Sequence, residues 1–268
     1  MNILIIGGGN MGLTYAKSFL EAHVLQEKDL MILEKSEERA AHLSTQNVGT
    51  VYASPADCLG KADLIVFAVK PQDTPNLFPI LKPYVDDQQV FLSIMAGVRM
   101  EYIREELGVT KIIRAMPNLP AQIGMGMTAF TSSDEVTRIE LVTVQNLLNT
   151  TGKAIYLDTE ELIDAATAIS GSGPAYVYYY MNAMIEAAKG LGFSESQAEL
   201  LVGQTFMGSV HLENRNNLSC REWIAKVSSK GGTTEAAIKI FDNREVNDKI
   251  VEGLNAAHQR AVELGKKS

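Results

Sequence analysis

Cysteine is scarce in this chain, which has only Cys58 and Cys220 among its 268 residues. Two thiols cannot form the disulfide framework on which small secreted domains depend, and they suggest a reducing compartment. The opening residues, Met-Asn-Ile-Leu-Ile-Ile, lack the basic start of a signal peptide and resemble a strand that runs into glycines. We therefore expect a cytoplasmic protein.

Long apolar runs and clusters of basic residues are also missing. No unbroken apolar stretch of about 18 residues occurs, so we expect no membrane span. Asp and Glu number 32 against 24 Lys and Arg, which gives a formal net charge of −8. A nucleic-acid surface needs clustered Lys and Arg to neutralise phosphates, so we expect no nucleic-acid partner.

Signals of a metal site or of a nucleophilic enzyme are absent as well. The four histidines, His23, His42, His211 and His258, share no metal-binding motif with Cys or Asp, and we expect no metal. No G-x-S-x-G nucleophile elbow is present. These absences favour a reaction such as hydride transfer, in which a cofactor carries the difficult step.

The first half of the chain alternates short apolar runs with amphipathic segments. Near-continuous apolar strands separated by helices predict a parallel sheet that is covered on both faces. The fold class is therefore α/β, with a Rossmann-type doubly wound sheet over residues 1–158. The expected strands are Ile3–Ile6, Leu30–Leu33, Leu64–Val69, Val90–Ile94, Ile112–Ala115 and Ala154–Leu157, and the expected helices include Asn10–Ala22, Glu37–Leu43 and Asp134–Asn149.

Residues 159–268 have a helical pattern throughout and predict an all-α second domain. Apolar residues recur at helical spacing from Val177 to Ala188, and Gly190 or Gly192 ends that helix. Capping boxes predict two more helix starts. Further helices are expected from Ser194 (with Gln197) to about Glu213, from Ser219 (with Glu222), from Thr234, and over Val246–Leu264. A tail of this kind, rich in Met, Tyr and Leu, has a large apolar area to cover, so we expect a homodimer formed through it.

A glycine turn follows the first expected strand and has the spacing G-x-G-x-x-G. Gly7 permits the tight turn, Gly9 lets the backbone approach a pyrophosphate, and Gly12 allows close packing of helix on strand. The helix that begins at Asn10 and Met11 would offer free N–H groups to the phosphates. In this position the motif predicts dinucleotide binding, although a glycine turn without a ligand would have the same spacing.

The end of the second expected strand carries a candidate ribose ligand, Glu34. Its carboxylate can accept hydrogen bonds from the ribose hydroxyls of NAD and would repel the 2′-phosphate of NADP. Lys35 and Arg39 could instead pair with that phosphate. The cofactor is therefore NADH or NADPH, with a slight lean to NADH, and an exposed turn is the alternative interpretation of Glu34.

Further cofactor contacts are expected where other strands end, because ligands of open α/β sheets bind outside the carboxyl ends of the strands. This rule marks the segments Ser93–Gly97 and Arg114–Pro120. A surface lysine that ends a strand would explain Lys70 equally well. The candidates at these ends are Ala68, Val69, Lys70 and Pro71, together with Ala96 and Gly97.

Two glycine-rich segments interrupt the helical half. In Ser170–Tyr176, Pro174 fits the start of a helix, which is an equally good structural explanation of the segment. In Val227–Thr234, backbone N–H groups and the hydroxyls of Ser229, Thr233 and Thr234 could hold a carboxylate. A simple N-cap at Thr233 is the alternative.

Taken in order, the motifs resemble the pyrroline-5-carboxylate reductase family. They are I-I-G-G-G-N-M-G at the start, A-V-K-P-Q at Ala68–Gln72, A-G-V at Ala96–Val98, R-A-M-P-N at Arg114–Asn118, L-I-D-A at Leu162–Ala165, S-G-S-G-P-A-Y at Ser170–Tyr176, and G-G-T-T at Gly231–Thr234. The resemblance covers essentially the whole chain. It implies the final step of proline biosynthesis and an interlocked dimer, which in this family often assembles into a ring of five dimers.

The resemblance also implies roles for single residues. Ser229 with Gly231, Gly232, Thr233 and Thr234 would bind the substrate carboxylate. The Thr234 hydroxyl would lie near the ring nitrogen and support its protonation as hydride reaches the imine carbon. Glu160 matches a position near the substrate ring, while Gly9–Met11 and Ala68–Pro71 match dinucleotide contacts.

Two departures from the family pattern lie beside this loop. Lys230 replaces a proline, and Ala225 replaces an aspartate. Another imine or keto-acid reductase therefore remains an alternative. A β-hydroxyacid dehydrogenase would need a lysine four residues after Asn182, where Glu186 stands. A non-catalytic dinucleotide-binding regulator is the second alternative.

Overall fold

The computed structural model describes residues 1–266, which fall into two compact units. The first unit is Met1–Ser172 together with the C-terminal residues from Ala257 on, and the second is Gly173–Ala256.

The first unit is built on one eight-stranded sheet in the order β3-β2-β1-β4-β5-β6-β7-β8. The first six strands along the chain are parallel, and their order is that of a Rossmann dinucleotide-binding sheet. The strands are β1 Ile3–Ile6, β2 Leu30–Leu33, β3 Thr50–Tyr52, β4 Leu64–Phe67, β5 Val90–Ser93, β6 Ile112–Met116, β7 Gly126–Ser132 and β8 Gly152–Tyr156. The α/β class expected from the alternating pattern is confirmed.

The sheet has two strands that the apolar pattern did not predict. One is β3, which has only three residues, none of them buried. The other is β7, whose sequence Gly-Met-Thr-Ala-Phe-Thr-Ser mixes polar and apolar residues. Because β7 runs antiparallel to β6, and β8 runs parallel to β7, the sheet is mixed at this edge.

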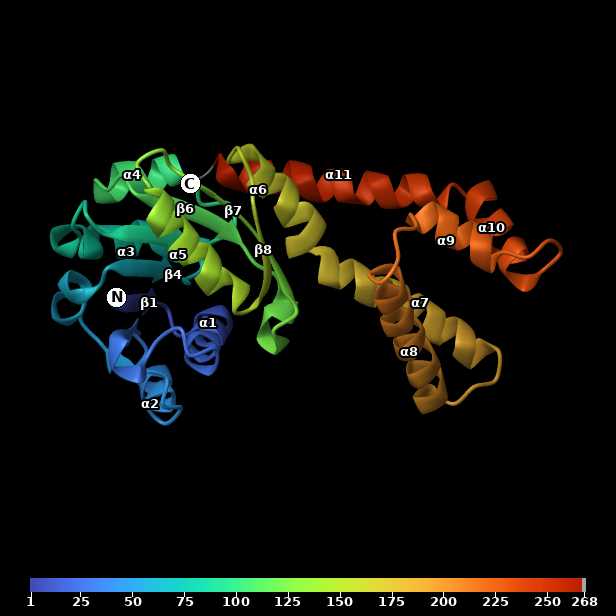
Figure 1. The fold of residues 1–268 in the computed structure, drawn as a ribbon, viewed down its shortest axis with the longest axis horizontal. Helices are drawn as coiled ribbons and strands as arrows, with labels where there is room; N and C mark the ends of the chain where they lie inside the picture. Colours follow the sequence, from blue (N-terminus) through green and yellow to red (C-terminus); the bar gives the residue numbers. More distant parts are fainter. Residues whose placement is uncertain (267–268) are drawn as a thin grey trace. The chain divides into compact units, whose positions relative to one another are not determined.

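Both faces of the sheet are covered by helices (Figure 1). Side chains alternate along β1, so that Ile3 and Ile5 enter one apolar cluster while Leu4 and Ile6 enter the other. The first cluster includes residues of α1, α2 and α5, and the second includes residues of α3 and α4. These helices are α1 Asn10–Glu21, α2 Glu37–Ser44, α3 Thr74–Leu81, α4 Met100–Leu107 and α5 Arg138–Asn149.

Capping side chains decide where several helices begin. The Thr137 side chain accepts a hydrogen bond from the backbone of Glu140, and this capping box starts α5 at Arg138, four residues later than the expected start. The capping boxes expected at Ser194 and Ser219 are both present. After α5 the first unit continues with α6, Glu161–Ala166, and a π-helix, Thr167–Gly171.

The second unit contains helices only, and its buried residues are Ala198 and Val202. Its helices are α7 Gly173–Gly190, α8 Glu195–Glu213, α9 Cys220–Val227, α10 Thr233–Asn243 and α11 Val246–Gly265, the last of which ends in the first unit. No residue of α7, α9 or α10 is buried. Large apolar side chains are instead exposed, among them Tyr179, Leu200 and Val227 at 77%, 72% and 64%. Apolar surface of this extent is typical of a subunit interface.

Candidate functional site

The glycine turn between β1 and α1 is held tightly against the neighbouring strands. The N–H of Gly7 donates a hydrogen bond of 2.9 Å to the carbonyl of Leu33, and its φ of +101° favours glycine. A Cβ at Gly7 would lie 2.9 Å from the carbonyl oxygen of Ala68. A Cβ at Gly12 would collide with the carbonyl oxygen of Gly7. The first and last glycines are therefore required by the packing of the protein itself.

The middle glycine of the motif lies in a different environment. A Cβ at Gly9 would meet no atom within 4 Å, so the space above this residue is open. Gly9 is the N-cap of α1, and no side chain caps the helix. The first N–H groups of α1 have no intrahelical partner, and they face a position where the backbone can be approached closely. A dinucleotide pyrophosphate fits this open helix start.

Glu34 is buried beneath the turn, and its side chain is only 5% exposed. Its Oε2 accepts the N–H of Gly8 at 3.0 Å, and its Oε1 accepts the N–H of Ser36 at 2.9 Å. The guanidinium of Arg39 lies 3.7 Å from the same Oε2. The carboxylate thus supports the glycine turn from the end of β2, a role that the sequence spacing did not reveal.

The two cations that could meet a ribose phosphate lie in different settings. Arg39 is paired with Glu34, whereas the Lys35 side chain is 85% exposed and lies 3.7 Å from Asp73. The segment after β4 lies beside the turn, because the N–H of Ala68 bonds to the carbonyl of Ile6 and Val69 packs against Gly7. These residues and the glycine turn share the carboxyl edge of the sheet.

Beyond that segment, Lys70 is exposed and Pro71 opens a short 3₁₀ helix, Pro71–Asp73. The end of β5 is occupied differently. Gly97 has a φ of +74°, and a Cβ there would lie 2.9 Å from Cβ of Leu264 in the last turn of α11. The glycine after Ala96 therefore accommodates a helix, which is a structural reason for its presence.

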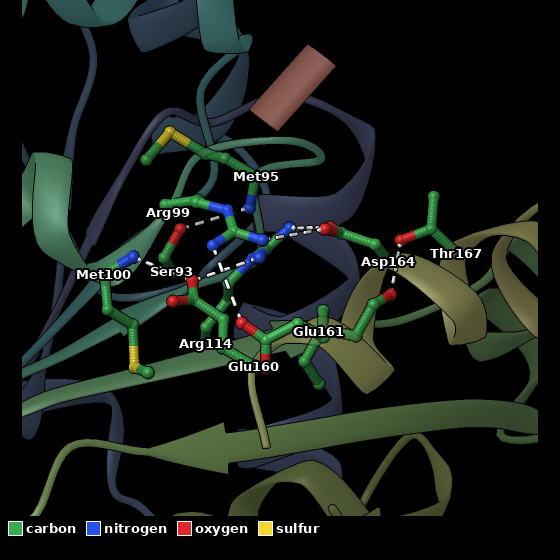
Figure 2. Close-up of polar contacts among 10 residues, drawn as sticks. Ser93, Met95, Arg99, Met100, Arg114, Glu160, Glu161, Asp164 and Thr167 are labelled. Carbon is green, nitrogen blue, oxygen red and sulfur yellow. Dashed lines mark hydrogen bonds and ion pairs between the residues drawn. The ribbon is translucent and has the colours of Figure 1, made fainter. Parts of the chain in front are cut away.

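The carboxyl ends of β5 and β6 carry a buried charge cluster that the sequence analysis did not anticipate (Figure 2). The Arg114 side chain is 1% exposed. Its Nη1 lies 3.0 Å from Oε1 of Glu160, and its Nη2 lies 2.7 Å from Oδ1 of Asp164. Arg99 adds a second cation, with Nη2 at 3.4 Å from Oδ2 of Asp164. Figure 2 shows the two guanidinium groups side by side, facing these carboxylates.

Glu160 joins this cluster to α4 as well. Its Oε1 also accepts the N–H of Met100 at 2.8 Å. The neighbouring Glu161 is more exposed, and its pKa is lowered by hydrogen bonds from its own backbone N–H and the Thr159 hydroxyl, with smaller contributions from Arg99 and Arg114. An arginine inside an otherwise apolar strand, and acids four residues apart at Glu160 and Asp164, were the signals that could have revealed the cluster.

Asn118 connects the same edge to the π-helix. Its Nδ2 donates to the carbonyl of Ser170 at 3.0 Å, and its Oδ1 accepts the N–H of Met127 at 2.8 Å. A Cβ at Gly171 would lie 2.8 Å from Cε of Met116. The beginning of the Ser170–Tyr176 segment is therefore part of the first unit and lies at the carboxyl end of β6.

In the second unit, the loop before α10 forms a compact turn. The N–H of Gly232 donates to the carbonyl of Ser229 at 2.9 Å, and the N–H of Gly231 donates to Oε2 of Glu235 at 2.7 Å. Gly232 is the N-cap of α10 and offers no side-chain cap, so Thr233 lies inside the helix. The Thr234 side chain is partly buried, whereas Ser229 and Thr233 are exposed. The start of α10 thus has N–H groups available to an anion.

Some features are missing from the described part of the chain. Within residues 1–266, no helix is long and apolar enough to cross a membrane. In the same range, no three His, Cys, Asp or Glu side chains converge as a metal ion would require.

The strand order and the open glycine turn define a dinucleotide-binding protein of the Rossmann class. Residues 2–97 match the model of a family described as NADP oxidoreductase coenzyme F420-dependent, and residues 160–264 match one described as pyrroline-5-carboxylate reductase dimerisation. The chain belongs to the pyrroline-5-carboxylate reductase family, an assignment supported by similarity over its whole length.

Two curated relatives illustrate this similarity. The pyrroline-5-carboxylate reductase of Aquifex aeolicus (strain VF5) is 35% identical over 266 residues, which is 98% of this chain and 97% of that one. The enzyme of the same name from Pseudomonas aeruginosa is 33% identical, with coverage of 98% and 97%.

Solved structures agree with this assignment. A pyrroline-5-carboxylate reductase from Coxiella burnetii has a TM-score of 0.90 and 30% identity, with 98% of each chain covered. The Plasmodium falciparum pyrroline carboxylate reductase with NADP bound has a TM-score of 0.89 and 26% identity, covering 99% of this chain and 98% of that one. The helical half of the present chain is therefore a dimerisation domain, as its exposed apolar helices indicate.

Proposed function

We propose that this chain is a pyrroline-5-carboxylate reductase, which transfers a hydride from NAD(P)H to the imine carbon of 1-pyrroline-5-carboxylate and yields L-proline. The observation that carries the proposal is the open space above Gly9 at an uncapped helix start, in a chain that matches the family over its whole length. A cleft-lining nucleophile is not needed, because the dinucleotide supplies the hydride.

The first unit would hold the dinucleotide. The N–H groups of Asn10, Met11 and Gly12 would bind the pyrophosphate at the start of α1. Glu34 would accept hydrogen bonds from the ribose hydroxyls in addition to those that it already accepts from two backbone N–H groups. This is possible because each carboxylate oxygen accepts more than one hydrogen bond. The remaining contacts would come from Gly7, Gly9, Lys35, Ala68, Val69, Lys70, Pro71, Ala96 and Gly97.

The expected preference between the two cofactors follows from Glu34 and its neighbour Arg39. A buried carboxylate next to the ribose disfavours a 2′-phosphate, which supports the slight lean to NADH. Arg39 weakens that effect, because its guanidinium lies beside Glu34 and could turn toward a phosphate. The two cofactors are therefore expected to differ modestly in kcat/KM.

The loop before α10 would hold the substrate. Ser229 and the segment Gly231–Thr234 would bind the carboxylate, using the N–H groups of an uncapped helix start. The Thr234 hydroxyl would stabilise the ring nitrogen as the hydride arrives, and Glu160 would lie near the ring. The substrate imine is a cation when protonated and is then ready to accept a hydride. The enzyme therefore needs little beyond a hydrogen-bond donor to the imine and groups that bind the substrate carboxylate.

Residues 1–158 would act as the dinucleotide-binding domain and residues 159–268 as the domain for substrate and dimerisation. Five such dimers would form a ring, in the cytoplasm and without a membrane or nucleic-acid partner. Light scattering of the purified protein tests the assembly, since a stable and active monomer at micromolar concentration would contradict even the dimer.

One assay tests the reaction. The purified chain is mixed with NADH or NADPH and 1-pyrroline-5-carboxylate, and cofactor oxidation is compared with proline formation. Equal amounts of both support the proposal. Oxidation with a keto acid but not with the imine would indicate another reductase, and cofactor binding without turnover of any substrate would indicate a regulator.

A further inference from the structure

Arg114 is the largest fully buried side chain among the described residues. It stands in β6 between Ile113 and Ala115, which are both buried, and pairs in register with Ser93 of β5. Its Nε has no hydrogen-bond partner within residues 1–266. A guanidinium in this position is costly to bury, and a buried ion pair is weak evidence for stability by itself. Its location therefore calls for a geometric explanation.

We propose that Arg114 and Asn118 are positioning residues for hydride transfer. They form a two-point clamp that holds α6 and the π-helix at the carboxyl edge of β5 and β6, the edge at which the ligands of such sheets bind. The proposal rests on the reductase function proposed above, and it assigns positioning roles to two residues of the segment Arg114–Pro120, which the strand-end rule marked only for cofactor contact.

The first point of the clamp is the fork of Arg114. Its two terminal nitrogens bind Glu160, which is the N-cap residue of α6, and Asp164, which follows four residues later on the same side. Two contacts separated by one helical turn fix both the rotation and the axial position of the helix. A lysine could not reproduce this arrangement, because its ammonium is a single point charge.

The contacts leave part of Glu160 available. Its Oε1 is used twice, by Arg114 and by the N–H of Met100. Its Oε2 makes no hydrogen bond or ion pair within the described residues, and the side chain is 14% exposed. The clamp therefore holds a carboxylate in one orientation while one of its oxygens stays open.

The second point of the clamp is Asn118, four residues further along the chain. Its amide binds both the carbonyl of Ser170 in the π-helix and the N–H of Met127 in β7. Single-turn π-helices are rare and occur frequently at functional sites. Because α7 follows the π-helix directly in the chain, Asn118 fixes the last residues of the first unit before the chain enters the second.

The test is a single-turnover measurement on the full-length enzyme with Arg114→Lys. In a single turnover, the amplitude counts the competent enzyme, and the rate constant reports the hydride-transfer step. We expect the rate constant to fall about 100-fold, the scale of a displacement of about 1 Å, with cofactor Kd changed less than about 3-fold. The control is Arg104→Lys, which alters a surface pair with Glu135 and should leave the rate constant unchanged.

The outcomes separate positioning from stability. A lower amplitude with an unchanged rate constant would mean that Arg114 only stabilises the fold, and this result would overturn the proposal. If Arg114→Lys does not fold, Asp164→Asn decides by the same criteria, since it keeps the size of the side chain. Failure of both variants to fold would also overturn the proposal. A wild-type enzyme that does not reduce 1-pyrroline-5-carboxylate would instead refute the proposed function.

Discussion

The backbone N–H of Gly8 donates a hydrogen bond of 3.0 Å to Oε2 of Glu34, a residue 26 positions further along the chain. A Cβ at Gly8 would lie 3.3 Å from the same oxygen and would collide with Leu43. The central position of the glycine turn is therefore fitted to the end of β2 and the last turn of α2. The shape of the turn depends on this carboxylate, and the proposed cofactor selection rests on the same group.

Replacing Glu34 by glutamine should shift the cofactor preference toward NADPH. The amide keeps one acceptor for Gly8 but removes the negative charge that repels a 2′-phosphate. We expect the ratio of kcat/KM for NADPH to that for NADH to rise about 10-fold, which corresponds to about 1.4 kcal/mol. Steady-state kinetics with both cofactors measures this ratio. Glu105→Gln, on the exposed side of α4, serves as the control, and a strong NADPH preference in the wild type would contradict the role of Glu34.

Substitutions in the glycine turn should separate folding from cofactor binding. Gly9→Val places its side chain in open space, so the free energy of unfolding should change little while cofactor binding is lost. Gly12→Ala places a methyl group against the carbonyl of Gly7, so the protein itself should be strongly destabilised. Chemical denaturation and cofactor titration, run on both variants, measure the two effects. A Gly9→Val variant that binds cofactor normally would exclude this turn as the pyrophosphate site.

Thr234→Ala should impair catalysis without weakening the cofactor complex. The hydroxyl is expected to form a hydrogen bond at the reacting centre, and loss of such a bond lowers kcat/KM on the order of 10-fold to 1000-fold. Cofactor Kd should stay within about 2-fold of the wild-type value. Thr143→Ala removes a hydroxyl from α5, where it bonds only to the carbonyl of Ile139, and provides the matched control. Unchanged turnover would remove Thr234 from the mechanism.

Acid should weaken the first unit partly through Glu140. Burial raises the pKa of this carboxyl, but hydrogen bonds from Lys111 and Thr137 together outweigh that effect. The pKa of Glu140 therefore lies below the ordinary value of 4.5. A pKa that is lower in the folded state contributes stability above the unfolded pKa, and this contribution is lost as the pH falls through the folded pKa. Glu140→Gln should therefore cost on the order of 1 kcal/mol at neutral pH.

The same comparison near pH 3 should show a smaller difference between wild type and Glu140→Gln, because the contribution of the carboxylate declines as the pH falls from the ordinary pKa of 4.5 toward the lowered pKa of the folded state. Urea denaturation at the two pH values measures both differences. A penalty that is equal at both pH values would mean that the ion pair with Lys111, which joins two partly buried side chains 2.9 Å apart, contributes nothing.

Elements defined by local chemistry could be predicted from the sequence. The bounds of β1 and β2 agree with the apolar runs Ile3–Ile6 and Leu30–Leu33. The capping boxes at Ser194 and Ser219 place the starts of α8 and α9 correctly. Each of these signals depends on neighbours within a few residues, which is why a linear pattern contains it.

Other elements depend on contacts with segments that are far away in the sequence, and a local sequence pattern does not show such contacts. The strand β7 mixes polar and apolar residues without a regular alternation, and it is stabilised by hydrogen bonds to β6 on one side and β8 on the other. The sequence pattern also did not show that the last turn of α11 lies against Gly97, because that turn is far away in sequence. Neither relationship can be derived from local propensity.

By itself, the sequence determined the glycine turn, the alternation of strands and helices, the starts of α8 and α9, and the order of motifs that identifies the family. Only the tertiary structure decided the partners of the buried charges. Arg114 meets acids that lie 46 and 50 residues away, and Glu34 meets an amide 26 residues before it. The physical reason is that a buried charge must be neutralised or hydrogen-bonded by whichever groups the order of the strands brings within about 3 Å.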